Sequence, residues 1–341
     1  MAYGTGQFVL MSPNADGAKG FASIDATAAA GGEDVAYLLD SATAGARDKL
    51  VVGKTPVQTG GAFTLDSLDV RVPLEMGSTG EGTSETTFAQ MTNAGRSYAN
   101  SVLGFDRLYA YSRSGNDTAT LNGSSGDDTL SITPAAGMMR YGGGGQALAI
   151  GFDYLEGSGG SAGLDSAYLY DTDGDDILTL SHQQQTVETT GPGGHVYGKT
   201  SGFEQVWGCG YNGGRDRVNF LDQADSSFFF GSQPMSSLYY ADGTLVGEYA
   251  FKEVDAVFGG GGDQVVLHAS PYFQEALSNT ARDELLLDEA GSNAYWIHLH
   301  GLDASAKVQD ARLQKNPDGT DQDSSSVAAI DYLFNLSWEQ W

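Results

Sequence analysis

The chain has 341 residues, of which 48 are glycine and 8 are proline, and its formal net charge is −27. Its 44 acidic residues against 17 basic ones create a field that repels nucleic acid and anionic membrane surfaces, so we exclude both as partners. The single cysteine, Cys209, excludes an intramolecular disulfide. Abundant glycine together with 17 tyrosines and 15 phenylalanines indicates many turns around a hydrophobic core.

The first block of a tandem repeat is an aromatic or aliphatic residue followed by an acid. It begins at Phe105, Phe152, Phe203 and Val254, at steps of about 50 residues. A fainter copy begins at Leu65, and an earlier one has lost the acid. We therefore expect one repeat domain over residues 1–320, with units starting near residues 21, 65, 105, 152, 203, 254 and 302.

A second block follows each first block and consists of an aspartate with apolar residues two and four positions later. This alternation predicts a short β-strand with one buried face, preceded by a glycine-rich turn. The absence of helical spacing between the blocks argues against alternating strands and helices. The aspartates that open these blocks are Asp34, Asp117, Asp165, Asp216 and Asp263.

Two all-β architectures accommodate a unit of this length, a parallel β-helix and a β-propeller. We favour the parallel β-helix, because the strands are very short, aspartate turns recur within a unit and the unit length varies. We expect a long loop over about residues 73–99, which lacks the aspartate block. Apolar residues at helical spacing near the end predict a short capping helix over residues 321–341.

Segments such as Gly126-Asp127-Asp128-Thr129-Leu130 resemble the calcium-binding glycine- and aspartate-rich repeats of secreted bacterial toxins. The longer unit is similar to glycine/aspartate-rich tandem repeats of large secreted bacterial proteins. The resemblance covers about a quarter of the chain, and the aspartates here do not keep the toxin repeats' register. It implies an extracellular or cell-surface protein, although the amino terminus carries no recognisable leader.

The aspartates have two interpretations. They are hard oxygen donors beside flexible glycine turns, which suits Ca²⁺, and they are also residues that accept hydrogen bonds from turn amides without any metal. The dense run from Asp171 to Asp176 is the strongest candidate for calcium. The candidate metal ligands are Asp117, Asp128, Asp171, Asp173, Asp175 and Asp176.

Aromatic and histidine side chains form the candidate carbohydrate-binding set. Aligned units place Tyr109, Trp207 and Phe258 in one outward column, which suits the apolar faces of sugar rings or, alternatively, ordinary stacking between coils. The strand of residues 296–300 alternates Trp296, His298 and His300 on one face, where two histidines suit a metal or a nearby carboxylate. Tyr211, in the turn after Cys209, completes the set.

Three functions fit these patterns. The first is an extracellular β-helix module that binds polysaccharide with Ca²⁺ as its candidate cofactor, and the second is a passive surface scaffold. The third is a polysaccharide-cleaving β-helix enzyme. A glycoside hydrolase is favoured over a lyase, because basic residues are scarce. Binding or scaffolding ranks above catalysis, since the regular repeat contains no distinctive catalytic cluster and no carboxylate pair stands out among the many acids.

Overall fold

The protein is an all-β solenoid of two sheets. The computed structural model describes residues 7–10, 23–28, 33–40, 47–56, 85–93, 99–113, 115–189, 195–222, 226–232, 234–259, 263–268, 275–279, 284–288, 296–300 and 307–312. These residues form 27 strands and no helix, so the described part holds no helical segment of the length and apolarity that crossing a membrane requires. The predicted cap helix over residues 321–341 lies outside the described residues.

Thirteen strands form sheet A. They are β1 (Gln7–Leu10), β3 (Val35–Leu39), β7 (Arg107–Tyr111), β9 (Thr129–Thr133), β10 (Ala136–Arg140), β11 (Gln146–Ile150), β13 (Ser166–Tyr170), β17 (Gln205–Cys209), β19 (Ser227–Ser232), β20 (Met235–Tyr240), β21 (Leu245–Tyr249), β23 (Gln264–His268) and β27 (Lys307–Arg312). Their order across the sheet is β1-β3-β7-β11-β10-β9-β13-β17-β21-β20-β19-β23-β27.

Fourteen strands form sheet B. They are β2 (Ser23–Thr27), β4 (Asp48–Pro56), β5 (Glu85–Asn93), β6 (Ala99–Leu103), β8 (Thr118–Asn122), β12 (Tyr154–Ser158), β14 (Asp176–Ser181), β15 (Gln184–Thr189), β16 (Val196–Ser201), β18 (Arg217–Leu221), β22 (Glu253–Val257), β24 (Glu275–Asn279), β25 (Glu284–Asp288) and β26 (Trp296–His300). Their order is β2-β6-β5-β4-β8-β12-β16-β15-β14-β18-β22-β26-β25-β24.

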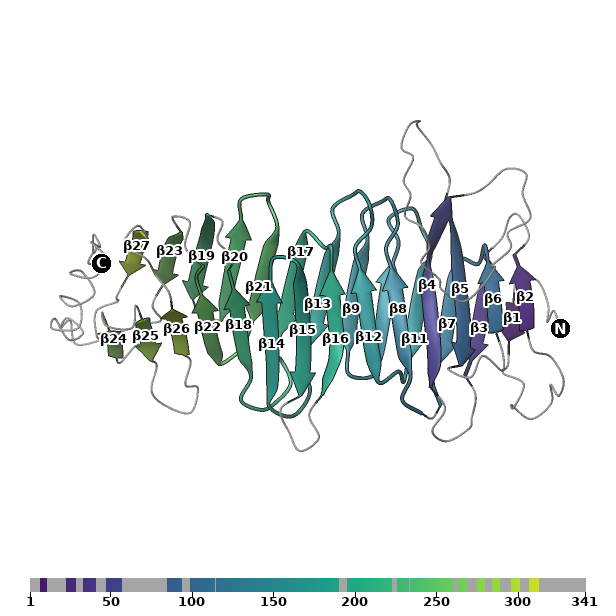
Figure 1. Cartoon of the computed structure of the whole chain (residues 1–341), viewed down its shortest axis with the longest axis horizontal. Coiled ribbons are helices and arrows are strands. Elements are labelled where there is room, and N and C mark those ends of the chain that lie inside the picture. The colour runs from purple at the N-terminus through teal and green to yellow at the C-terminus, as the bar shows by residue number, and fades with distance from the viewer. Residues whose placement is uncertain are drawn as a thin grey trace.

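The strands lie across the long axis of a rod, with β1 and β2 at one end and β24 and β27 at the other (Figure 1). Strands of the same sheet that are one turn of the solenoid apart pair in parallel, as β13 does with β17. Some turns of the solenoid are replaced by a three-stranded antiparallel meander, such as β9-β10-β11. The predicted parallel β-helix is therefore confirmed, with these meanders as an addition, and the alternative propeller is not.

One sequence repeat is built as one strand in the first sheet, one strand in the second and a meander back in the first. The repeat that begins at Phe105 comprises β7 in sheet A, β8 in sheet B and the meander β9-β10-β11 in sheet A. Because each repeat visits the sheets three times, the next repeat begins in the opposite sheet, at β12 in sheet B, then β17 in sheet A and β22 in sheet B. Equivalent residues of successive repeats thus lie on opposite faces.

The core lies between the sheets. The second and fourth residues of a typical strand are buried, which gives the alternating pattern seen in β8 and β9. Large residues of one sheet fill the space over glycines of the other: the Leu130 side chain occupies the place of a missing Cβ at Gly157, and Leu178 does the same at Gly208. This complementarity keeps the rod thin and its core close-packed.

The structure corrects the start of the repeat unit expected near residue 254. Phe105, Phe152 and Phe203 are buried two residues before β7, β12 and β17, and Phe251 holds that place before β22. The unit therefore begins at Phe251 and not at Val254. Asp263 then follows Phe251 at the distance that separates Asp117 from Phe105.

The predicted loop over residues 73–99 is also corrected in its second half. Residues Glu85–Asn93 form β5, and Ala99 begins β6, and both strands belong to a meander with β4. The sequence did not reveal these strands because β5 is long and lacks the aspartate that opens the other blocks.

Candidate functional site

The outward face of sheet A carries a row of apolar and aromatic side chains along the rod. Strand register places Tyr37 beside Tyr109, and farther along the rod it places Tyr168 beside Trp207. Leu148, Met138 and Ser131 connect the two pairs in register. Adjacent members are separated by about 4.8 Å, the distance between neighbouring strands.

Trp207 lies flat on sheet A. A Cβ built at Gly247, the register partner of Trp207 on β21, would lie 2.5, 2.7 and 3.0 Å from the three ring atoms Cζ3, Cε3 and Cη2. Three such similar distances indicate that the six-membered ring covers Gly247 with its face and not with its edge. The glycine is therefore what permits the indole to lie against the neighbouring strand, and Trp207 itself is only half-buried.

Exposed tyrosines extend this aromatic surface beside Trp207. The rings of Tyr211 and Tyr249 are in contact, with centroids 5.4 Å apart, and the two residues are 59% and 39% exposed. Tyr170, on the neighbouring strand β13, is the register partner of Cys209, the last residue of β17. At the other end of the row, the Tyr37 and Tyr109 rings are stacked with centroids 5.2 Å apart, so that pair shows the stacking between coils that was the alternative interpretation.

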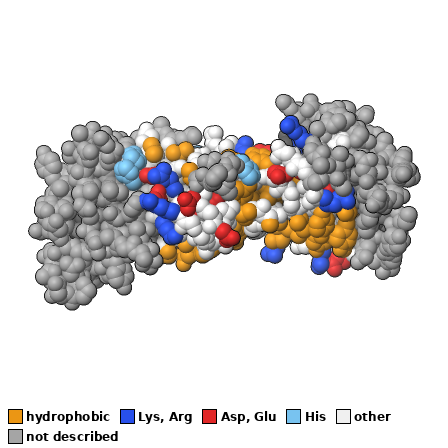
Figure 2. Space-filling view, turned by 90° about the horizontal axis from the view of Figure 1, so that it is seen from below, with side chains coloured by type: hydrophobic (Ala, Val, Ile, Leu, Met, Phe, Trp, Pro, Cys, Tyr) orange, Lys and Arg blue, Asp and Glu red, His pale blue; other side chains and the backbone are white. Residues whose placement is uncertain are grey.

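The outward face of sheet B has a polar central row, and Leu221 and Val257 are exposed hydrophobic residues beside it. Its central row, in register across β8, β12, β16, β15, β14, β18, β22 and β26, consists of Thr120, Glu156, Lys199, Thr186, Thr179, Asn219, Asp255 and His298. Figure 2 shows hydrophobic side chains gathered over the half of the described rod nearer the amino terminus, in a view turned from that of Figure 1. The two faces of the solenoid therefore differ in chemistry.

The predicted carbohydrate-binding set does not form one site. Tyr109 and Trp207 lie on sheet A, whereas Trp296, His298 and His300 belong to β26 in sheet B. Phe258 was wrongly included, because it is 5% exposed and packs against Phe229 in the core. Its assignment to the Trp207 column followed from starting that repeat unit at Val254 and not at Phe251. The true equivalent of Trp207 there is Asp255, the third residue of β22.

The acidic residues of both repeat blocks form a ladder of hydrogen bonds between coils. The carboxylate before one strand accepts the backbone N–H at the start of the preceding parallel strand, an amide that the sheet leaves without a partner. Asp117 accepts from Asp48 N at 2.6 Å, and Asp153 accepts from Asp117 N at 2.8 Å. In sheet A, Asp165 accepts from Asp128 N at 2.8 Å. Amide capping is thus what these aspartates do, and it explains their recurrence.

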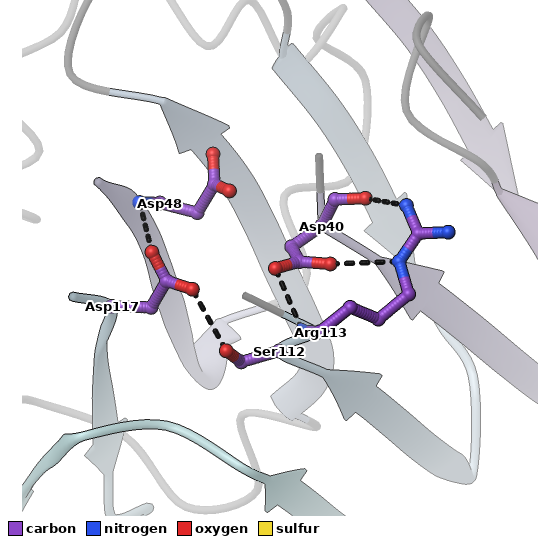
Figure 3. Close-up of polar contacts among 5 residues, drawn as sticks. All are labelled: Asp40, Asp48, Ser112, Arg113 and Asp117. Atoms are coloured by element: carbon purple, nitrogen blue, oxygen red, sulfur yellow. Dashed lines mark hydrogen bonds and ion pairs between the residues drawn. The ribbon is translucent and has the colours of Figure 1, made fainter. Parts of the chain in front are cut away.

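Asp117 belongs to a buried group of three carboxylates with Asp40 and Asp48 (Figure 3). Arg113 pairs with Asp40 through its Nε at 2.9 Å, and Ser112 donates its hydroxyl to Asp117 at 2.7 Å. Burial, with the nearby charges of Asp48 and Asp40, raises the pKa of Asp117.

Asp40 and Asp48 were not predicted as members of this group. The block Asp48-Lys49-Leu50-Val51-Val52 has an aspartate with apolar residues two and four positions later. It was therefore readable as a further copy of the second block and as the start of β4.

The run from Asp171 to Asp176 is spread over a turn. Asp171 and Asp176 are buried, whereas Asp173 and Asp175 are exposed. Asp171 accepts from Tyr211 N at 3.2 Å and from Asn212 N at 2.9 Å. Among the described residues this run is not one of the groups whose ligand atoms lie within reach of a shared ion. Calcium binding here stays a prediction.

Replacing the two kinds of aspartate separates capping from calcium binding. We expect Asp171→Ala to lower the free energy of unfolding by about 2 kcal/mol or more, because it leaves amides of the next coil without an acceptor. We expect Asp173→Ala to change it by less than about 0.5 kcal/mol. Urea unfolding with and without chelator measures both. A chelator-dependent midpoint that Asp173→Ala abolishes would instead identify a calcium ion at this turn.

The fold and these clusters define the class of the protein as a two-sheet β-solenoid with one aromatic and one polar face. Comparison of the chain with protein-family models, with curated proteins and with solved structures found no match.

Proposed function

We propose that this protein is a polysaccharide-binding solenoid module whose binding face is the outward face of sheet A. The observation that carries the proposal is the indole of Trp207, which lies face-down over Gly247 beside Tyr168. A ring in this position offers its outer face to a ligand at little entropic cost, since it is already held against the sheet. Sugar rings present apolar C–H surfaces that pack on such aromatic faces.

The direction of the aromatic row supports an elongated ligand. The row runs along the rod axis at the strand spacing of about 4.8 Å. This spacing is of the order of the length of one sugar unit in an extended chain, so successive side chains of the row can contact successive sugars. Location outside the cell, as the resemblance to secreted repeat proteins implies, is part of this proposal.

A pull-down against soluble and insoluble polysaccharides tests the proposal. We expect Trp207→Ala to weaken retention roughly tenfold or more, as truncation of a central aromatic anchor does. Gly247→Ala keeps the indole but displaces it, so we expect weaker retention together with altered tryptophan fluorescence. Tyr154→Ala is the matched control, because Tyr154 is an outward aromatic of sheet B, and we expect its retention to equal that of the parent chain.

The same assay distinguishes the other functions. Equal retention of the parent chain and Trp207→Ala would contradict the proposed face. Oligosaccharides released into the supernatant would make the protein a polysaccharide-cleaving enzyme. A chain that is retained by no glycan and whose oligomeric state changes with Trp207→Ala would use this face for a second copy of itself.

A further inference from the structure

The polar face of sheet B brings together three side chains whose chemistry differs from that of the aspartate ladder. Asp255 is the central residue of β22, and His298 is its register partner on β26. His300 follows two residues later on the same face of β26. The ligand atoms of these three residues all lie within 4.8 Å of one another. They come from segments more than 40 positions apart, which the chain brings together by folding the β24-β25 hairpin to the far side of β26.

One carboxylate oxygen faces both imidazoles. Asp255 Oδ1 lies 3.4 Å from His298 Nδ1 and 3.8 Å from His300 Nε2. The other oxygen, Oδ2, lies 3.0 Å from Arg217 Nε. This ion pair orients the carboxylate so that Oδ1 is directed toward the histidines. The imidazole rings lie side by side, with centroids 3.8 Å apart.

We propose that Asp255, His298 and His300 bind a divalent transition-metal ion, through Oδ1, Nδ1 and Nε2 respectively. Bonds of about 2.0–2.2 Å to a tetrahedral ion place the ligand atoms about 3.3–3.6 Å apart, so small rotations of the side chains complete the site. Two imidazoles with one carboxylate suit Zn²⁺ and its neighbours and disfavour Ca²⁺, which prefers oxygen ligands. The three side chains are 20–32% exposed, which leaves the remaining coordination positions open to water or a further ligand.

This site is independent of the proposed glycan face, because it lies in the other sheet. It also differs from the predicted calcium ligands in residue type and position. A bound ion would link strand β22 to its neighbouring strand β26 in sheet B. Bound metal should therefore stabilise the native chain by mass action, in proportion to its occupancy.

Calorimetric titration of the full chain with Zn²⁺, and in parallel with Ca²⁺, tests the proposal. We expect one Zn²⁺ equivalent to depend on the three residues, with at least about tenfold weaker binding in Asp255→Asn, His298→Gln and His300→Gln. We expect the Ca²⁺ titration to be the same in all four proteins. His182→Gln is the matched control, since His182 pairs with a single carboxylate, Asp242, at 2.8 Å, and it should bind Zn²⁺ as the parent does.

Thermal unfolding with and without Zn²⁺ gives a second readout that also reports whether each variant is folded. We expect Zn²⁺ to raise the unfolding midpoint of the parent chain and of His182→Gln but not of the folded variants His298→Gln and His300→Gln. Zn²⁺ binding and stabilisation that persist unchanged in both of these variants would overturn the assignment. So would the absence of any Zn²⁺ binding by the parent chain.

Discussion

Replacing Gly160 by alanine should lower the free energy of unfolding by about 3 kcal/mol or more, the upper end of what overpacking costs. A Cβ at Gly160 would overlap the backbone carbonyl oxygen of Ser124 in the neighbouring coil. That carbonyl accepts from Ser161 N at 3.1 Å, and Gly160 N donates to Asp165 Oδ2 at 2.5 Å. Because backbone lies on both sides of the contact, the two turns must separate to admit one methyl group.

Gly143→Ala is the matched control for Gly160→Ala. Neither glycine has a left-handed backbone, and a Cβ at Gly143 would meet only the Lys54 ammonium group, at 3.6 Å. We expect its free energy of unfolding to change by less than about 1 kcal/mol. The urea unfolding midpoints of the two variants, compared with that of the parent chain, test this expectation. Similar midpoints would show that neighbouring coils are not in contact at this turn.

The free energy of unfolding should fall as pH rises from about 4.5 to about 8. Glu248 lies in the core on β21, and burial raises its pKa to about 8. The folded chain therefore keeps a proton that the unfolded chain has released over this range, and raising the pH favours unfolding. The loss amounts to the order of 4 kcal/mol across the whole window. Burial also raises the pKa of Asp216, to about 7, which adds to the same slope.

Glu248→Gln tests the source of this pH dependence. Glu248 Oε2 accepts from Phe251 N at 3.1 Å, an interaction that a glutamine carbonyl retains, whereas Oε1 has no hydrogen-bond partner among the described residues. We expect the variant to unfold with a flatter pH dependence and to exceed the parent in stability at pH 8. Glu156→Gln, on the surface of β12, should leave the slope unchanged.

Asp242 titrates in the opposite sense but outside this window. The Thr244 amide lowers the pKa of Asp242, so its contribution to stability is lost only as the pH falls below the ordinary range of an aspartate. A slope that Glu248→Gln leaves unchanged would therefore place the titrating group elsewhere in the chain.

The local pattern predicted the strand that follows each block-opening aspartate because its physical cause is local. An aspartate with apolar residues two and four positions later requires one face of a short strand to be buried, and β8, β13 and β18 each follow that rule. The pattern failed where a strand follows a different rule. The long strand β5 lacks the aspartate, and the antiparallel meanders contain strands such as β10 whose pairing depends on their neighbours.

The aromatic column shows how a correct pattern can lead to a wrong site. Tyr109 and Trp207 share a position in the repeat and do lie on the same face, but only because two repeats separate them. The intervening equivalent, Glu156, lies on sheet B. Alignment alone carries no information on how many times a repeat crosses between the sheets.

By itself, the sequence determined the all-β class, the repeat length and the residues that alternate between core and surface. These depend on backbone periodicity and on the burial of apolar side chains, both of which are encoded within a few residues. Only the tertiary structure decided which coil each aspartate caps, that Trp207 lies over Gly247, and that Asp255 meets His298 and His300. Those contacts join segments 36 or more residues apart, and their partners are chosen by the order in which the meanders place strands in the two sheets.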